Sequence, residues 1–139
     1  MRTLQQIGER LEYLVSGSAQ PEDAAELLQL GEETLQQWVL ARGLDPTTGK
    51  REGFRLLALH HQGAQGEPSF NACRETCREL VYHYNLLQLS PDGADVQKNT
   101  AMMALVANHL FLFISGKMQT RQLGEFCCAS KPLRSEARS

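Results

Sequence analysis

The sequence predicts an all-α protein, a compact bundle of about five helices. Apolar residues recur three and four positions apart along most of the chain, which is the spacing of one helix face. No segment alternates regularly between apolar and polar residues, as half-buried strands do. Turns that contain Gly or Pro separate the apolar stretches, so we expect short loops between the helices.

The length indicates one domain. A chain of 139 residues is long enough to bury a core without a disulfide or a structural metal. We expect a single helical domain over residues 1–128 and a flexible C-terminal tail over residues 129–139.

Clear boundary signals frame the first two predicted helices. The first runs from Thr3 to Ser16 and ends in a Ser-Gly-Ser turn. The second begins at Pro21, whose missing N–H suits the first helical position, and acidic residues follow near the positive end of the helix dipole. Gly43 is a natural left-handed cap, and Asp45-Pro46 prevents the helix from continuing.

The third and fourth helices are separated by a loop rich in Gly and Pro. We expect the third over Lys50–Gln62. The fourth begins with a cap at Ser69 or Asn71 and ends before the Ser-Pro-Asp-Gly turn of residues 90–93.

The fifth predicted helix is apolar over most of its circumference. It should run from Ala94 to Ser115, end at Gly116, and be followed by a short helix within Lys117–Cys128. Its apolar residues form two stripes, and a helix that is apolar over most of its circumference is either central or shared with a second chain. The second stripe is our candidate partner or dimer interface: Met102, Leu105, Val106, His109, Leu112 and Phe113.

Three different elements could bury this stripe, and the sequence does not distinguish between them. The chain's own first helix would make the fifth helix an ordinary core helix. A symmetric copy would make the protein a homodimer, and a different protein would make it a binding module, because helix-in-groove contacts use the same spacing.

Charge and hydropathy restrict the classes of partner that we expect. The formal net charge of −2 argues against a general polyanion binder, although acidic residues dominate residues 1–48 and basic residues dominate 49–139. No secretory signal is visible, and the apolar stretch Ala101–Ile114 is shorter than a membrane span. We therefore expect a cytoplasmic protein that contacts no membrane, with its four cysteines as thiols.

The cysteines form two pairs. Cys73 and Cys77 lie one helical turn apart on an apolar stripe, where buried thiols behave as small apolar groups. Cys127 and Cys128 are adjacent, and adjacent cysteines chelate one zinc ion poorly. We expect core packing for the first pair, and a thiol or metal sensor built from all four remains an alternative function.

Catalytic patterns are missing from the sequence. None of His60, His61, His83 and His109 has a carboxylate at a spacing that would mark a catalytic pair. No Gly-x-Ser-x-Gly elbow occurs either. We expect no catalytic residue, no cofactor and no metal, and a protein that binds another macromolecule.

DNA binding is the strongest rival interpretation. Residues 34–60 can be read as a helix, a turn and a second helix that begins with Lys50, Arg51 and Arg55. However, the connection over residues 43–49 is longer than the usual three or four residues, and the leading helix is acidic. Direct contact with nucleic acid is therefore the alternative, not the expectation.

Two stretches resemble a known family. They are Arg51-Glu52-Gly53-Phe54-Arg55-Leu56-Leu57-Ala58-Leu59-His60 and Phe70-Asn71-Ala72-Cys73-Arg74-Glu75-Thr76-Cys77-Arg78-Glu79-Leu80. The region Lys50–Leu87 resembles small pseudomonad quorum-sensing antiactivators of the QslA type. The resemblance covers less than a third of the chain and supplies no motif whose residues carry over one by one.

The resemblance implies a cytoplasmic helical homodimer. Such a protein binds the ligand-sensing domain of a LuxR-type transcription activator, blocks dimerisation of the activator and so prevents DNA binding. A sequestering protein of this kind needs a partner surface and no catalytic group.

Overall fold

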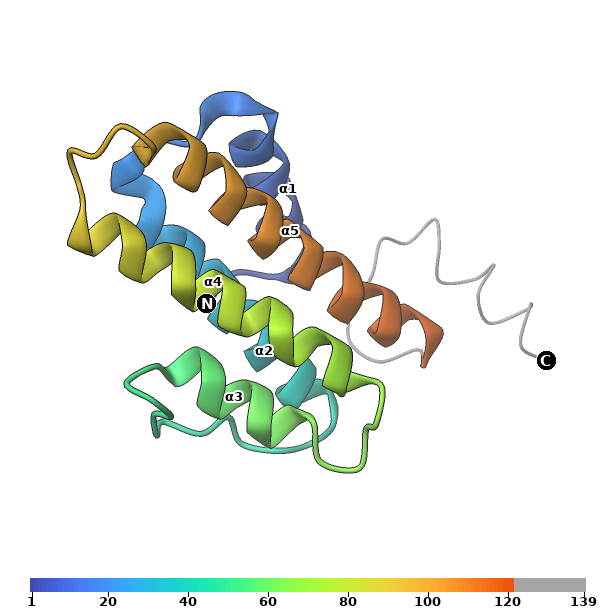
Figure 1. Cartoon of the computed structure of the whole chain (residues 1–139). Helices are drawn as coiled ribbons and strands as arrows, with labels where there is room; N and C mark the ends of the chain where they lie inside the picture. The colour runs from blue at the N-terminus through green and yellow to red at the C-terminus, as the bar shows by residue number, and fades with distance from the viewer. Residues whose placement is uncertain (122–139) are drawn as a thin grey trace.

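Five α-helices and two short helical turns make up residues 1–121, the part of the chain that the computed structural model describes (Figure 1). No strand occurs in this part, so the prediction of an all-α fold is confirmed. The helices are α1 (Leu4–Tyr13), α2 (Ala24–Ala41), α3 (Arg55–Gly63), α4 (Phe70–Leu89) and α5 (Val96–Thr120).

Helix α5 is one of the two central helices of the bundle, together with α2. It packs along α4 and α2, and α1 crosses it on another side (Figure 1). Helix α3 packs against α2 and α4 at the far end of the molecule. Helix α5 is long and apolar enough to cross a membrane by length and composition, with a mean hydropathy of 1.4 over its most apolar window, and 39% of that window is buried in the bundle.

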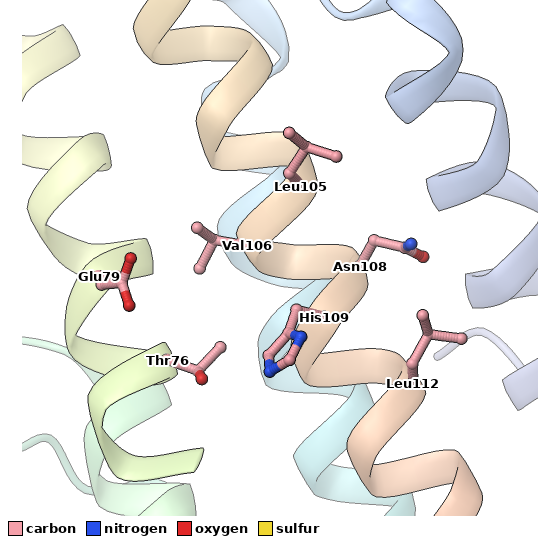
Figure 2. A pocket seen from close by; sticks show the side chains of 7 residues that line it. All are labelled: Thr76, Glu79, Leu105, Val106, Asn108, His109 and Leu112. Carbon is pink, nitrogen blue, oxygen red and sulfur yellow. The ribbon is translucent and has the colours of Figure 1, made fainter. Parts of the chain in front are cut away.

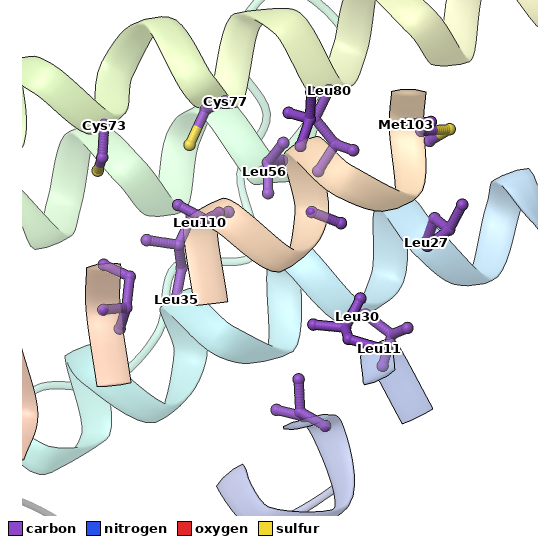
Figure 3. Close-up of a cluster of buried hydrophobic side chains, with 14 of the residues drawn as sticks. Leu11, Leu27, Leu30, Leu35, Leu56, Cys73, Cys77, Leu80, Met103 and Leu110 are labelled. Atoms are coloured by element: carbon purple, nitrogen blue, oxygen red, sulfur yellow. The ribbon is translucent and has the colours of Figure 1, made fainter. Parts of the chain in front are cut away.

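The core is a leucine-rich layer between α2, α4 and α5 (Figure 3). Gly31 of α2 permits the close approach of the helices, because a Cβ there would lie 2.8 Å from Leu80 Cδ2 and 3.1 Å from Leu56 Cδ1. At the α3 end, Trp38 is fully buried and its indole N–H donates to the carbonyl oxygen of Gly63 at 2.9 Å. Any larger residue at Gly31 would have to displace the side chains of Leu80 and Leu56.

The predicted boundaries of the first two helices are nearly right. Thr3 caps α1 in a capping box with Gln6, and a π turn over Leu14–Ser18 extends the helix to the predicted Ser-Gly-Ser turn. Pro21 opens a 3-10 turn, Pro21–Asp23, that leads into α2. Gly43 is left-handed with φ 80°, and the Leu44 amide donates to the Val39 carbonyl at 3.1 Å, as a helix C-cap requires.

Two predicted boundaries are wrong. Helix α3 begins at Arg55 instead of Lys50, because Arg51 and Phe54 pair across a tight turn in which Glu52 and Gly53 have positive φ. Helix α5 continues through Gly116 to Thr120, because Ile114 and Met118 on either side are fully buried and hold the helix in place. Residues 117–120, which we assigned to a separate short helix, belong to α5. Residues 122–128 of that segment, like the tail over residues 129–139, lie outside the described residues.

Candidate interaction face on α4 and α5

The structure divides the six predicted interface residues into two groups. Met102, Leu105 and Leu112 are large apolar side chains that remain 40%, 49% and 59% exposed, and His109 is exposed beside them. We call these four residues the α5 stripe. Their spacing of three, four and three residues places them in one line along the helix.

Val106 and Phe113 pack toward the interior, although Val106 also lines the groove described below. Val106 is buried, and Phe113 is half-buried with its ring set edge-on to the fully buried Phe70 of α4 at a centroid distance of 5.7 Å. Each lies one position beyond a residue of the stripe, and one position turns a side chain by about 100° around a helix. That rotation carries Val106 and Phe113 toward α4.

A groove of about 500 Å³ runs beside the stripe between α4 and α5. Helix α4 supplies Thr76 and Glu79, which face Val106 and His109 of α5 across the groove (Figure 2). The remaining lining residues come from the α5 side: Leu105, Asn108 and Leu112. The walls therefore combine three aliphatic side chains with four hydrogen-bonding groups, a hydroxyl, a carboxylate, an amide and an imidazole.

The α4 wall was not predicted from the sequence. Thr76 and Glu79 each precede a buried residue of α4, Cys77 and Leu80, by one position. They therefore sit at the edge of the buried face, where a side chain lines a groove between two helices. The only signal in the sequence is that both residues lie at the margin of the apolar stripe of α4. This signal indicates a groove wall only when α5 is known to be the neighbouring helix.

His83 lies one turn beyond Glu79 on α4. Burial lowers the pKa of His83, and the nearby Glu79 carboxylate only partly opposes this effect. The Nδ1 atom of His83 is buried and has no hydrogen-bond partner among the described residues. The imidazole is therefore held mostly in its neutral form at the margin of the face.

Cys73 and Cys77 are buried free thiols on the inner side of α4, as predicted (Figure 3). The thiol of Cys77 lowers the pKa of Cys73 to about 6, and His60 and His109 act in the same direction, while burial opposes them. The same contact and burial raise the pKa of Cys77. The pair is therefore chemically unequal, with the more acidic thiol nearer the start of α4.

The alternatives that the sequence left open have less geometric support. Within residues 1–121, no three His, Cys, Asp or Glu side chains lie together as a metal ion would require. Cys127 and Cys128 lie outside the described residues. Lys50 and Arg51 precede α3, and Arg55 at its start donates to the Thr47 carbonyl at 2.9 Å, so the three basic side chains do not share the start of a recognition helix.

The face is suited to contact with another protein, because exposed apolar residues at helical spacing lie along a groove with a few polar groups. Comparisons with known proteins found no matching family model, no matching curated protein and no matching solved structure.

Proposed function

We propose that this protein is a regulatory binding protein that acts without catalysis, through the α5 stripe and the adjoining groove. The observation that carries the proposal is the exposure of Met102, Leu105 and Leu112 along one line of α5, whose other side is buried in the bundle. Isolated exposed apolar side chains are common on protein surfaces, but a contiguous row beside a groove is typical of an interface.

The proposed target is the ligand-sensing domain of a LuxR-type transcription activator, in the cytoplasm. This partner class is the one that the sequence resemblance implies. The second resembling stretch, residues 70–80, contains Thr76 and Glu79, which form the α4 wall of the groove. Binding would occupy the surface through which the activator dimerises, and the activator would then release its DNA.

The experiment is a gel shift with a LuxR-type activator, its ligand and its operator DNA. Adding the protein should release the DNA, and the Leu105→Asp and Leu112→Asp variants should fail to do so, because a buried carboxylate without a partner costs binding energy. Leu44→Asp is the matched control, since Leu44 is 43% exposed and lies outside the groove. Equal release by all variants would refute the proposed face, and no release by the wild type would refute the proposed target.

A homodimer is the second candidate use of the α5 stripe. One turn beyond Leu112, Gly116 leaves open space, with no heavy atom within 4 Å of the position of a Cβ. The stripe therefore runs from the large Met102 to a vacant position at Gly116, with His109 midway between them. An antiparallel copy would set the large end of one stripe against the open end of the other, an isologous contact.

Sedimentation velocity over a range of protein concentrations tests the dimer. Wild type and Leu44→Asp should self-associate, whereas Leu105→Asp should sediment as a monomer. If the wild-type protein is monomeric and still releases the activator from DNA, the dimer is excluded and the α5 stripe binds the activator alone.

A further inference from the structure

We propose that Cys73 and Cys77 form an oxidisable dithiol, which a hydroperoxide closes to a reversible disulfide within α4. This site is independent of the proposed binding function. It rests on the position of the two thiols, on the local structure of the helix at Cys73 and on the surrounding imidazoles. All the residues that carry these three observations lie between positions 60 and 109.

The first step of the argument is proximity. The two cysteines are four residues apart on one helix, and both side chains are directed from α4 into the bundle (Figure 3). Residues at this spacing have Cβ atoms about 5–6 Å apart, whereas a disulfide requires about 3.5–4.5 Å. Closure therefore needs a local adjustment of the helix of about 1–2 Å.

The second step is that α4 can make this adjustment where Cys73 lies. Cys73 is in the first turn of α4, and the amides that precede it form hydrogen bonds of the 3-10 type, from Phe70 to Glu67, from Asn71 to Pro68 and from Ala72 to Ser69. Ser69 provides no side-chain cap for this turn. A first turn without a side-chain cap rearranges at lower cost than the middle of a helix.

The third step is reactivity. The thiolate is the nucleophilic form of cysteine, and a thiol with a lowered pKa near an imidazole is the form that peroxides attack. Cys73 has this character, and Cys77 remains a protonated thiol beside it. The pair thus supplies one attacking and one resolving sulfur.

The His60 ring has a fixed orientation near the start of α4. His60 is buried, and its Nε2 lies 3.0 Å from the Phe70 carbonyl oxygen. A protonated Nε2 donates to this oxygen, which orients the ring at the base of the first turn of α4. The imidazole is thus held at the start of α4, three residues before Cys73.

The reaction balances with a hydroperoxide as the oxidant. The Cys73 thiolate attacks one peroxide oxygen, the O–O bond breaks, and the other oxygen leaves as an alcohol or water after taking up a proton. The Cys77 sulfur then attacks the resulting sulfenic acid, an S–S bond forms, and water leaves with the Cys77 proton. The two thiols lose two electrons in total, and the peroxide gains them.

Cys73 is 2% exposed, so a peroxide reaches it when the first turn of α4 opens locally. A disulfide that strains the helix is also readily reduced, which makes the modification reversible.

The test uses the full chain with Cys127→Ser and Cys128→Ser, so that only the proposed pair can react. The protein is fully reduced, treated with one equivalent of hydrogen peroxide, denatured and alkylated, and the peptide of residues 70–89 is examined by mass spectrometry. We expect both thiols to be lost together, with a mass decrease of two hydrogen atoms, and to return after dithiothreitol.

Single-cysteine variants of the same background separate the two roles. With Cys77→Ser, oxidation should stop at a sulfenic acid on Cys73 that dimedone traps. With Cys73→Ser, the remaining Cys77 should stay alkylatable after the same treatment. Circular dichroism identifies any single-cysteine variant that fails to fold. In that case the test rests on the peroxide reaction of the protein in which both Cys73 and Cys77 are present.

Four outcomes would overturn the proposal, and the first three concern where the oxidation occurs. These are two thiols that remain alkylatable after peroxide, an oxidised Cys77 in the absence of Cys73, and disulfide-linked dimers in place of the intrahelical bond. Loss of only one thiol to a stable sulfinic acid would also overturn it, because a resolving sulfur within reach would have intercepted the sulfenic acid.

Discussion

The ring of Phe113 stands edge-on to the ring of Phe70, with 5.7 Å between the centroids, and fixes the rotation of α5 against α4. The adjacent Leu112 is thereby turned outward and is 59% exposed. Two consecutive apolar residues thus have different roles, one in the core and one on the face proposed for binding.

The first prediction separates these roles. Phe113→Asp should lower the free energy of unfolding by about 2–4 kcal/mol, because it removes the packing on Phe70 and places a carboxylate in an apolar site. Leu112→Asp should change it by less than about 0.5 kcal/mol, as is usual for exposed positions. Urea unfolding followed by circular dichroism measures both values, and equal destabilisation would mean that Leu112 is also part of the core.

The second prediction compares two glycines within helices. Gly31→Ala should destabilise the protein by about 1–3 kcal/mol, since the new methyl group would lie 2.8 Å from Leu80 Cδ2. Gly116→Ala should stabilise the monomer by about 0.5–1 kcal/mol, since the position is helical and open. Thermal unfolding of the two variants should therefore shift the midpoint in opposite directions.

The third prediction concerns pH and Glu67. Burial alone would raise the pKa of Glu67, but the hydrogen bond from Arg121, just after α5, and the charge of Lys117 on α5 outweigh burial and lower the pKa. The Arg121 guanidinium lies 2.6 Å and the Lys117 ammonium 3.4 Å from the carboxylate. The stabilisation is fully present above the unfolded-state pKa of about 4.3 and is lost as the pH falls through the lower folded-state value.

Glu67→Gln removes this dependence. The variant should be less stable than the wild type at pH 7, and the difference should shrink on acidification below about pH 4.3. Urea unfolding at several pH values provides the measurement, with Glu12→Gln as a control at an exposed carboxylate. A difference that stays constant down to pH 3 would contradict the proposed role of the ion pairs.

The fourth prediction concerns the acidity of the thiol pair. In the protein with Cys127→Ser and Cys128→Ser, one thiolate should form with a midpoint near pH 6, because Cys77 and His60 stabilise the ionised Cys73. The second thiol should stay protonated well above the usual range of cysteine. Thiolate absorbance during a pH titration detects both steps, and a single transition near the ordinary cysteine pKa would contradict the assignment.

Much of the fold could be predicted from the sequence because its signals are local. Pro21 and Gly43 bound α2 through backbone preferences that need no tertiary neighbour. The start of α3 could not be predicted in this way. Glu52 adopts a positive φ, and its carboxylate pairs with Arg78 of α4 at 2.8 Å, a contact that depends on the packing of distant elements.

The candidate face has only a partial signal in the sequence. Periodicity identifies an apolar stripe on α5, but it cannot separate Leu112 from Phe113 until Phe70 is placed beside them. Thr76 and Glu79 became recognisable as the opposite wall only when α4 and α5 were seen as neighbours. The oxidisable pair was visible as a spacing, whereas its unequal acidity depends on the tertiary placement of His60 and His109.

The most direct test of the proposed binding face is a sedimentation titration of the ligand-sensing domain of a LuxR-type activator. Wild-type protein and the Leu44→Asp control should form a complex with the domain and reduce its dimer, whereas the Leu105→Asp/Leu112→Asp double variant should leave the domain unchanged. A double variant that folds normally and binds the domain as tightly as the wild type would contradict the account.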